Sequence, residues 1–400
     1  MDHIKVDFEH VWLAIIAGGK GTRLFPLSHM SCPKQFCQLD KENTFIQATA
    51  KRFIALGVKP EQVVVLTTND GQTALAKEQL RSLGVIEPNI YQISDKYGYA
   101  GAMIKTNLFI RDIDKDAIVI NTPSDQYIVP SDAFTDTLTL AINSASEGNP
   151  TVLGVKVNDM VTFTGCGHAV YNRADTGICK KVLNFVEKPK QDIAVKMMRA
   201  NNSACNTGIN VWHVETMVKA VVGINLEKGE LATDKFMACF KQLYLAIGTF
   251  DWHDCGTLKS LYDISAKTPN HKNASLGEGM IYREDCRNSL FYSVKGVNIY
   301  ATKVEGAAVV VNEINDHIFI AVIAMDESQL VKDLTTNFPV YEPILGNDFS
   351  IKARNNIIPA TNYSHEINVG LIGVNGYTIL ANKKPDGSID INVSGERKMT

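Results

Sequence analysis

Short apolar runs rich in β-branched residues alternate with amphipathic stretches from residue 11 onward, and this alternation limits the folds open to the chain. Four runs have the length and composition of buried strands: residues 11–17, 62–66, 117–120 and 151–155. Strand-helix-strand alternation favours an α/β fold, because each crossover returns the chain to a parallel strand. We therefore predict a mostly parallel, Rossmann-like sheet flanked by helices.

The segment between the third and fourth runs predicts the clearest helix, over residues 131–147. Ser131 is a candidate N-cap, and Gly148 lies just beyond the expected end. Apolar side chains recur between them at helical spacing, at Phe134, Leu138, Ala141, Ile142 and Ala145.

Helical periodicity largely disappears after a polar stretch rich in Gly, Pro and Asn at residues 266–279. We expect an α/β domain over residues 1–275, a small β cap over 276–340 and a β-rich C-terminal extension over 341–400. The last third of the chain is thus predicted to be mainly β, and it shows no internal repeat of solenoid period.

Turn signals predict several connections in this last third. Residues 312–316 would join strands at 309–311 and 317–324 in a hairpin, and a helix over 326–334 would close that unit.

Asn375-Gly376 is the strongest short-range hairpin signal in the chain, and it predicts that residues 367–374 pair with 377–381. Pro385-Asp386-Gly387 predicts a second turn, into a strand over 388–393.

The charge balance excludes several partners. Lys and Arg number 40 against 43 Asp and Glu, a net charge of −3, so the chain lacks the positive field that holds a nucleic acid. The longest apolar stretch, residues 318–325, is far shorter than the roughly 18 residues of a membrane span. The charged first ten residues do not resemble a signal peptide, so we expect a cytoplasmic protein.

The eight cysteines are scattered, with no Cys-x-x-Cys pair. Cys32 and Cys37 have no second pair that would complete a structural zinc site. We interpret the cysteines as buried free thiols in a reducing compartment.

A glycine-rich turn follows the first predicted strand and contains Gly18, Gly19 and Gly21. Such a turn lets backbone N–H groups approach phosphate oxygens. The third small residue of a Rossmann fingerprint is missing, because Leu24 stands there, and a Walker A string is absent. The pairing of the glycines with two cations, Arg23 and Lys34, predicts a phosphate-binding loop.

This segment and several downstream motifs resemble the sugar-1-phosphate nucleotidyltransferase family, and the chain looks like a divergent member of its mannose-1-phosphate guanylyltransferase branch. The resemblance covers about residues 10–335 and leaves the last 65 or so without a counterpart. The matching strings are Gly18-Gly19-Lys20-Gly21-Thr22-Arg23-Leu24-Phe25-Pro26-Leu27, Pro33-Lys34-Gln35-Phe36, Pro123-Ser124-Asp125, Phe185-Val186-Glu187-Lys188-Pro189, Asn206-Thr207-Gly208-Ile209 and Trp252-His253-Asp254-Cys255-Gly256-Thr257.

The resemblance implies the nucleotide-diphospho-sugar transferase fold, with residues 1–275 as the catalytic domain. It also implies a reaction in which a sugar 1-phosphate attacks the α-phosphorus of a nucleoside triphosphate and releases pyrophosphate. GTP and mannose 1-phosphate are the expected substrates. Charge neutralisation and positioning would supply most of the catalysis.

Residue roles follow from the same resemblance. Gly18, Gly19, Gly21 and Gly98 would hold the nucleotide, Arg23 the outgoing phosphates and Lys34 the α-phosphate. Asp125 and Asp254 would bind Mg²⁺, and Asp125 is therefore also catalytic. Lys188 would meet the sugar phosphate, while Glu187, Asn206 and Gly165 would line the sugar hydroxyls.

Two departures from the family pattern leave the substrates open. Residues 94–103 lack most of the branch's polar side chains, so we expect few side-chain donors to a base from Ala100, Gly101 and Met103. Cys166 and His168 replace two aromatic residues near the expected sugar site. A heptose or another phosphorylated metabolite with a different base, and a non-catalytic nucleotide-sugar-binding regulatory subunit, remain alternatives. The sequence also leaves the oligomeric state open, a homo-oligomer included.

Overall fold

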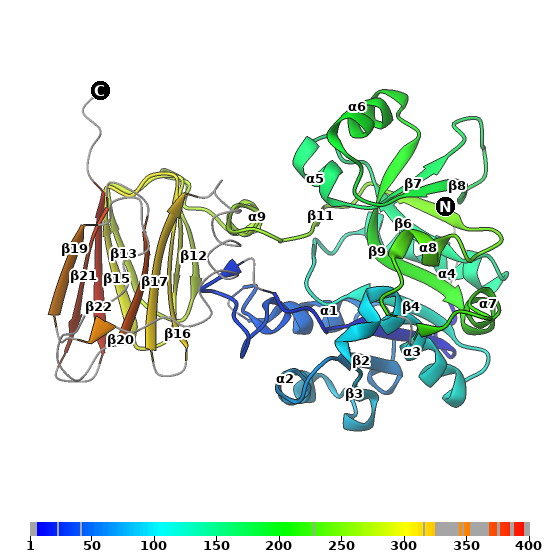
Figure 1. Cartoon of the computed structure of the whole chain (residues 1–400), viewed down its shortest axis with the longest axis horizontal. Helices are drawn as coiled ribbons and strands as arrows, with labels where there is room; N and C mark the ends of the chain where they lie inside the picture. Colours follow the sequence, from blue (N-terminus) through cyan, green and yellow to red (C-terminus); the bar gives the residue numbers. More distant parts are fainter. Residues whose placement is uncertain are drawn as a thin grey trace. The chain divides into compact units, whose positions relative to one another are not determined.

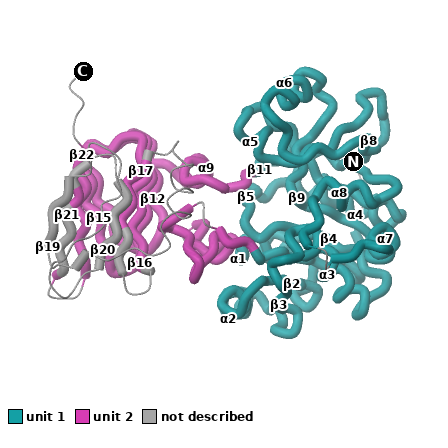
Figure 2. Tube along the Cα trace, viewed as in Figure 1, with its two compact units in different colours: residues 1–18, 46–252 teal, residues 19–45, 253–400 magenta. Residues whose placement is uncertain are grey.

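The computed structural model describes residues 6–21, 24–40, 42–226, 229–314, 317–324, 344–345, 348–352, 368–373, 377–384 and 388–395. The chain folds as two compact units (Figure 2). Unit 1 comprises residues 1–18 and 46–252, and unit 2 comprises residues 19–45 and 253–400.

Unit 1 is built on a nine-stranded sheet with the order β3-β2-β1-β4-β9-β6-β10-β8-β7 (Figure 1). The first four strands of this order are parallel, and they include three of the predicted strands. β9 runs antiparallel to both β4 and β6, so the sheet is mixed, and the α/β class is confirmed. The strands are β1 (Val11–Ile16), β2 (Val63–Thr67), β3 (Ile90–Gln92), β4 (Ile118–Pro123), β6 (Thr151–Val155), β7 (His168–Tyr171), β8 (Lys180–Val186), β9 (Ser203–His213) and β10 (Tyr244–Gly248).

The predicted helix is α4, Asp132–Ser146. The Ser131 hydroxyl accepts the backbone N–H of Phe134 at 3.3 Å, and Gly148 takes a positive φ of 85° just after the helix. The predicted apolar stripe is buried. The other helices of this unit are α1 (Phe45–Ile54), α2 (Asp70–Leu80), α3 (Gly98–Ile113), α5 (Met160–Gly165), α6 (Gln191–Ala200), α7 (Val214–Ala220) and α8 (Thr233–Met237), and two short strands, β5 (Tyr127–Ile128) and β11 (Trp252–His253), lie outside the main sheet.

Unit 2 contains a β sandwich whose strands lie in two sheets (Figure 1). Phe291 and Val309 of one sheet and Ile299 and Ile391 of the other share one hydrophobic core. One sheet has the order β12 (Ala274–Gly277), β14 (Leu290–Ser293), β16 (Ala307–Ile314), β17 (His317–Ala324), β20 (Asn368–Gly373), β18 (Ile344–Leu345), and the other has the order β13 (Ile281–Glu284), β15 (Val297–Thr302), β22 (Ile389–Gly395), β21 (Tyr377–Lys383), β19 (Asp348–Lys352).

From β12 to β16 the chain passes alternately between the two sheets, and strands within each sheet are parallel there. This is a coiled, solenoid-like path, although the sequence shows no repeat. Tight corners permit it: a Cβ on Gly277, whose φ is +83°, would lie 2.2 Å from the Ser293 carbonyl oxygen. The coil depends on backbone geometry at its corners, which leaves the sequence of each turn free to vary.

The predicted turns have different outcomes. β16 and β17 form the expected antiparallel hairpin. The strand predicted over residues 388–393 is β22, which pairs with β21, and the predicted turn at 385–387 lies outside the described residues. The pairing predicted around Asn375-Gly376 is wrong, because β20 joins β17 and β18 while β21 lies in the other sheet with β19 and β22. The helix predicted over residues 326–334 lies outside the described residues.

The two units divide the chain differently from the predicted limits at residues 275 and 340. Residues 19–45 belong with the sandwich, since the buried Asn312 amide donates to the carbonyl oxygens of Pro26 and Leu27 at 2.7 and 3.2 Å. The expected cap and extension also share sheets, through the pairs β17–β20 and β15–β22.

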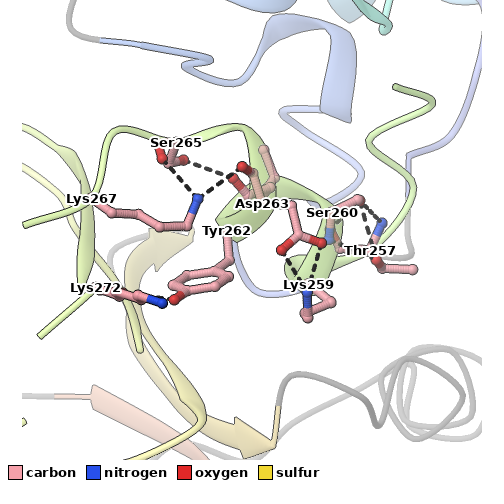
Figure 3. A network of polar contacts seen from close by, with 9 residues as sticks. Thr257, Lys259, Ser260, Tyr262, Asp263, Ser265, Lys267 and Lys272 are labelled. Atoms are coloured by element: carbon pink, nitrogen blue, oxygen red, sulfur yellow. Dashed lines mark hydrogen bonds and ion pairs between the residues drawn. The ribbon is translucent and has the colours of Figure 1, made fainter. Parts of the chain in front are cut away.

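Helix α9 (Leu258–Ile264) leads into the sandwich, and side chains at both of its ends fix it (Figure 3). Thr257 and Ser260 form a capping box at its start, and Lys259 pairs with Asp263 one turn later at 2.5 Å. The Tyr262 hydroxyl donates to the Lys272 carbonyl at 2.7 Å, which ties the helix to the polar stretch that follows. Among the helices that the structure describes, none is long and apolar enough to cross a membrane.

Candidate functional site

Gly18 lies two residues beyond the end of β1 in unit 1, and its backbone contacts the residue that follows β2. The Thr68 hydroxyl donates to the Gly18 carbonyl at 3.1 Å, and a Cβ on Gly18 would lie 2.5 Å from the Thr68 methyl group. Glycine at this position therefore allows a close approach of two loops at the carboxyl edge of the parallel strands.

The remaining glycines of the loop pack against the Pro-Lys-Gln segment inside unit 2. Lys34–Phe36 forms a 3₁₀ turn, and the Gln35 amide donates to the Gly19 carbonyl at 2.9 Å. Gly21 has a φ of +61°, and a Cβ there would lie 2.4 Å from the Lys34 backbone nitrogen. The predicted loop and the predicted lysine are thus brought together, while Arg23 lies outside the described residues.

Lys34 is buried, with 3% of its surface exposed. Its ammonium group donates to the backbone carbonyl of Asp254 at 2.6 Å and lies 5.3 Å from the centre of the Phe45 ring. The Gly-rich, Pro-Lys-Gln and Trp-x-Asp motifs therefore meet at the Lys34 turn, through the Gln35 amide, the Lys34 backbone and the Lys34 ammonium. The Lys34 side chain is therefore packed within unit 2.

The Asp254 carboxylate is exposed at the point where the chain turns toward α9. Cys255, the next residue, is buried and takes a φ of +52°. The Thr257 of this motif caps α9, which gives the end of the motif a structural role. Asp254 therefore lies on a sharp turn, and the residues after it are held in place by the burial of Cys255 and by the Thr257 cap of α9.

Asp125 lies in unit 1 directly after β4, in a half-buried turn. Its negative charge faces the Tyr99 phenol: burial raises the pKa of Tyr99 well above its usual range, and Asp125 raises it further. The Tyr99 hydroxyl donates to the Gly208 carbonyl at 3.2 Å. The Asp125 turn, the Asn-Thr-Gly turn and α3 thus meet at Tyr99.

Gln126 follows Asp125 in the chain, and it is 6% exposed. Its Oε1 is buried with no hydrogen-bond partner among the described residues. A buried acceptor without a donor is unusual, and it indicates that a polar group can bind beside Asp125. Carboxylate and amide oxygens are the hard donors that Mg²⁺ takes together with phosphate and water. No cluster of three metal-ligating side chains occurs within the described residues.

Four predicted sugar-binding residues come together in unit 1. Glu187 lies over Gly167, because a Cβ there would be 2.5 Å from its Oε2. The Lys188 N–H donates to the Cys166 carbonyl at 3.1 Å, and the Asn206 N–H donates to the Gly167 carbonyl at 2.8 Å. Gly165, at the end of α5, has open space where a side chain would be. Lys188 is exposed, and its ammonium lies 3.7 Å from Glu187.

His168 sits beneath this cluster and is fully buried. Its ring stacks on Phe163 with centroids 3.9 Å apart, and its Nε2–H donates to the Phe163 carbonyl at 2.7 Å. Burial lowers the pKa of His168 below its ordinary value. His168 therefore supports α5 from inside the fold through Phe163. A histidine in place of the aromatic residue expected at this position changes the side chain that packs under α5.

Gly98 takes a φ of +61° at the start of α3, and the Glu230 side chain occupies the space where a Cβ would be. The three following residues from which few donors to a base were expected, Ala100, Gly101 and Met103, are all buried. Ala100 and Met103 are buried in the hydrophobic core because they lie on the face of α3 packed against it, and Gly101 is also buried. Ligand contacts from this segment therefore have to come from its exposed start.

Sequence reasoning assigned no role to Tyr99, Gly167 and Glu230. Tyr99 carried a usable signal, since it is a large polar aromatic residue inside a run of small apolar ones. The others depend on the approach of loops that are distant in sequence, which no local pattern reports.

Two partly buried tyrosines, Tyr91 and Tyr99, predict that stability falls at high pH. Burial raises the pKa of Tyr91 to about 12, and the pKa of Tyr99 is raised further. The unfolded chain loses these protons from about pH 10 while the folded chain keeps them, so the free energy of unfolding decreases above that pH, by up to about 1.4 kcal/mol per pH unit for each tyrosine. Urea unfolding between pH 8 and 11 should show a shallower decrease for Tyr99→Phe. Tyr282→Phe is the control, because Tyr282 is exposed and its loss should leave the wild-type pH dependence unchanged. If the free energy of unfolding fell equally steeply with pH in Tyr99→Phe and wild type, the assignment to Tyr99 would be contradicted.

The chain is similar to known nucleotidyl transferases. The family model described as nucleotidyl transferase matches residues 13–271. Mannose-1-phosphate guanylyltransferase 2 of Escherichia coli O157:H7 is 25% identical over 321 residues, which cover 70% of this chain and 64% of that protein. Mannose-1-phosphate guanylyltransferase of Sinorhizobium fredii is 31% identical over 209 residues, covering 51% and 40%. The chain thus spans less than two thirds of the length of either relative.

Among solved structures, the protein described as mannose-1-phosphate geranyltransferase from Thermus thermophilus is similar, with a TM-score of 0.68 and 23% identity. The alignment covers 83% of this chain and all of that one. This likeness confirms the predicted fold.

Proposed function

This chain belongs to the nucleotidyl transferase family, and we propose that it joins a nucleoside triphosphate to a sugar 1-phosphate, giving a nucleotide sugar and pyrophosphate. GTP and mannose 1-phosphate are the proposed substrates, on the basis of the names of the relatives. The observation that carries most of the proposal is the convergence of three motifs on Lys34, whose ammonium reaches Asp254 while its backbone packs against Gly21.

The proposed reaction joins two anions, so positioning and charge dominate the barrier. An oxygen of the sugar phosphate attacks the α-phosphorus, the bond from that phosphorus to the bridging oxygen breaks, and pyrophosphate leaves. Lys34 would neutralise charge on the α-phosphate, and Arg23 on the leaving group. The backbone N–H groups of Gly18, Gly19 and Gly21 would hold nucleotide phosphates, and Gly98 the base.

Lys188 would bind the phosphate of the sugar, and Glu187 and Asn206 its hydroxyl groups, beside the open surface at Gly165. The exposed ammonium of Lys188 is compatible with an anionic ligand, and its 3.7 Å distance from Glu187 keeps both groups at one edge of the cluster. Asp125 and Asp254 would hold Mg²⁺. When bound, that ion would neutralise phosphate charge and orient the phosphates for in-line displacement.

The deciding experiment measures pyrophosphate release for GTP, ATP, CTP, UTP and dTTP against a panel of hexose and heptose 1-phosphates, with Mg²⁺ present. The proposal predicts turnover with GTP and mannose 1-phosphate. Turnover confined to another pair would favour the alternative in which a heptose or other metabolite and a different base are used. Binding of a nucleotide sugar without any turnover would favour the regulatory subunit.

We expect base selectivity to be weak. Strong discrimination requires polar groups that the wrong base leaves unpaired, and the core position of Ala100 and Met103 removes side chains of α3 from that role. The ratio of kcat/KM for GTP to that for the next best nucleotide should stay below about 10⁴, the range of a site built on dedicated polar contacts. A larger ratio would contradict this expectation.

A further inference from the structure

Two thiols flank the Lys34 turn and touch one another. The sulfur atoms of Cys32 and Cys37 are 3.9 Å apart. A disulfide needs about 2.05 Å, so the two sulfurs must approach by roughly 2 Å for a bond to form. The residues between them are Pro33 and the 3₁₀ turn Lys34–Phe36. A disulfide between Cys32 and Cys37 would therefore close a short loop around Lys34, the residue on which the proposed reaction depends.

The two cysteines have unequal surroundings. Cys37 is 5% exposed, and its thiol lies 3.4 to 3.6 Å from the carbonyl oxygens of Leu27, Cys32 and Pro33, all of which can accept its proton. Cys32 is partly exposed, at the end of a turn closed by reciprocal backbone hydrogen bonds with His29 at 3.1 Å. The hydrogen bond from Cys37 lowers the pKa of Cys32, whereas that same contact, together with burial, raises the pKa of Cys37. Cys32 thus has the access that an attacking thiol needs, and its pKa is shifted in the direction that favours the thiolate.

We propose that Cys32 and Cys37 are a disulfide-forming modification site that reacts with a low-molecular-weight disulfide, and that closure of the bond displaces Lys34. In the first step the Cys32 thiolate attacks one sulfur of the small disulfide, forming a mixed disulfide and releasing one small thiolate. In the second, Cys37 loses its proton to solvent and attacks the Cys32 sulfur, releasing the second small thiolate. The pair gives up two electrons and two protons, and the small disulfide is reduced to two thiols.

Any backbone movement that accompanies closure acts on the Lys34 turn. The Cys37 N–H donates to the Lys34 carbonyl at 3.0 Å, the Gln35 amide holds Gly19, and the Lys34 backbone has no spare room against Gly21. A movement of either cysteine backbone is therefore transmitted to the Lys34 ammonium and its contact with Asp254. Displacements of about 1 Å can lower a rate by up to about 100-fold. This consequence for activity rests on the proposed function, whereas the disulfide itself does not.

The test treats the full-length protein with a series of glutathione disulfide to glutathione ratios, blocks remaining thiols by alkylation, and maps linked peptides by mass spectrometry. We expect a Cys32–Cys37 link in the wild type. Cys37→Ser should stop at a mixed disulfide on Cys32, and Cys32→Ser should leave Cys37 unmodified. Cys239→Ser, which changes a partly buried thiol elsewhere, should still form the link.

The site would be overturned if oxidised wild-type protein lacked the link. It would also be overturned if Cys37 in the Cys32→Ser variant were modified as fully as Cys32 is in the Cys37→Ser variant. Pyrophosphate release should fall by about tenfold or more on oxidation and return with dithiothreitol. An oxidised, linked protein with unchanged turnover would overturn the displacement of Lys34 while leaving the disulfide established. A chain without turnover in either redox state would contradict the proposed function alone, because the peptide map is independent of activity.

Discussion

Replacing Asp125 with asparagine is expected to lower pyrophosphate release by at least about a hundredfold while leaving the fold intact. The asparagine has the same shape but lacks the charge that a divalent cation needs, and metal stabilisation of phosphate charge amounts to several kcal/mol, or several factors of ten in rate. Asp125 is half-buried at the end of β4, so the substitution should change the free energy of unfolding by about 0.5 kcal/mol or less. Steady-state kinetics over a range of Mg²⁺ concentrations, together with urea unfolding, measure both quantities.

Asp132→Asn is the matched control, because Asp132 is an exposed carboxylate only a few residues away, in the first turn of α4. It should keep wild-type kinetics. A raised Mg²⁺ requirement for Asp125→Asn would separate loss of a ligand from general damage. Near-normal turnover of both Asp125→Asn and Asp254→Asn would remove the metal assignment.

Local patterns predicted the elements of the first unit well, because burial on both faces of a parallel sheet produces continuous apolar runs. They could not predict strand direction, since a fully buried strand has the same composition in parallel and antiparallel pairs. β9 shows this limit: it is buried over most of its length yet antiparallel to both of its main neighbours.

The error at Asn375-Gly376 has a different cause. An Asn-Gly pair favours a turn, but a turn fixes only the local reversal of the chain. Whether β20 and β21 then pair depends on how the strands are distributed between the two sheets. In this chain β20 pairs with β17 in one sheet, and β21 pairs with β22 in the other. Long-range pairing thus overrode a local preference.

In the candidate site too, local patterns predicted some features, and long-range contacts determined the others. Motif strings identified Lys34, Asp125, Glu187 and Asn206 by residue type and order, and the structure shows which of them share a loop or a turn. The burial of Lys34, the Tyr99 bridge and the orphaned Gln126 oxygen depend on contacts between segments far apart in sequence. Such contacts decide how a residue acts, so the sequence alone could name the groups but not their surroundings.

The burial of Lys34 changes the expected effect of Lys34→Met. From the sequence, loss of a loop lysine beside glycines would affect turnover far more than stability. In the structure the ammonium donates to the Asp254 carbonyl, so methionine leaves that acceptor without this donor, at a cost of about 1–3 kcal/mol in the free energy of unfolding. Turnover should also fall by at least about a hundredfold, because a fixed cation at the α-phosphate is lost. Urea unfolding and kcat/KM for the preferred nucleotide measure the two effects separately.

Lys20→Met provides the comparison, since Lys20 is an exposed lysine of the same glycine loop. It removes one positive charge from an exposed side chain, so it should leave stability unchanged within about 0.5 kcal/mol. If Lys34→Met lost stability but kept wild-type kcat, Lys34 would be a structural residue that holds the Asp254 turn. If both lysine variants lost turnover equally, the general charge of the loop would matter rather than the Lys34 position. Only a large loss specific to Lys34→Met agrees with a catalytic cation at this position.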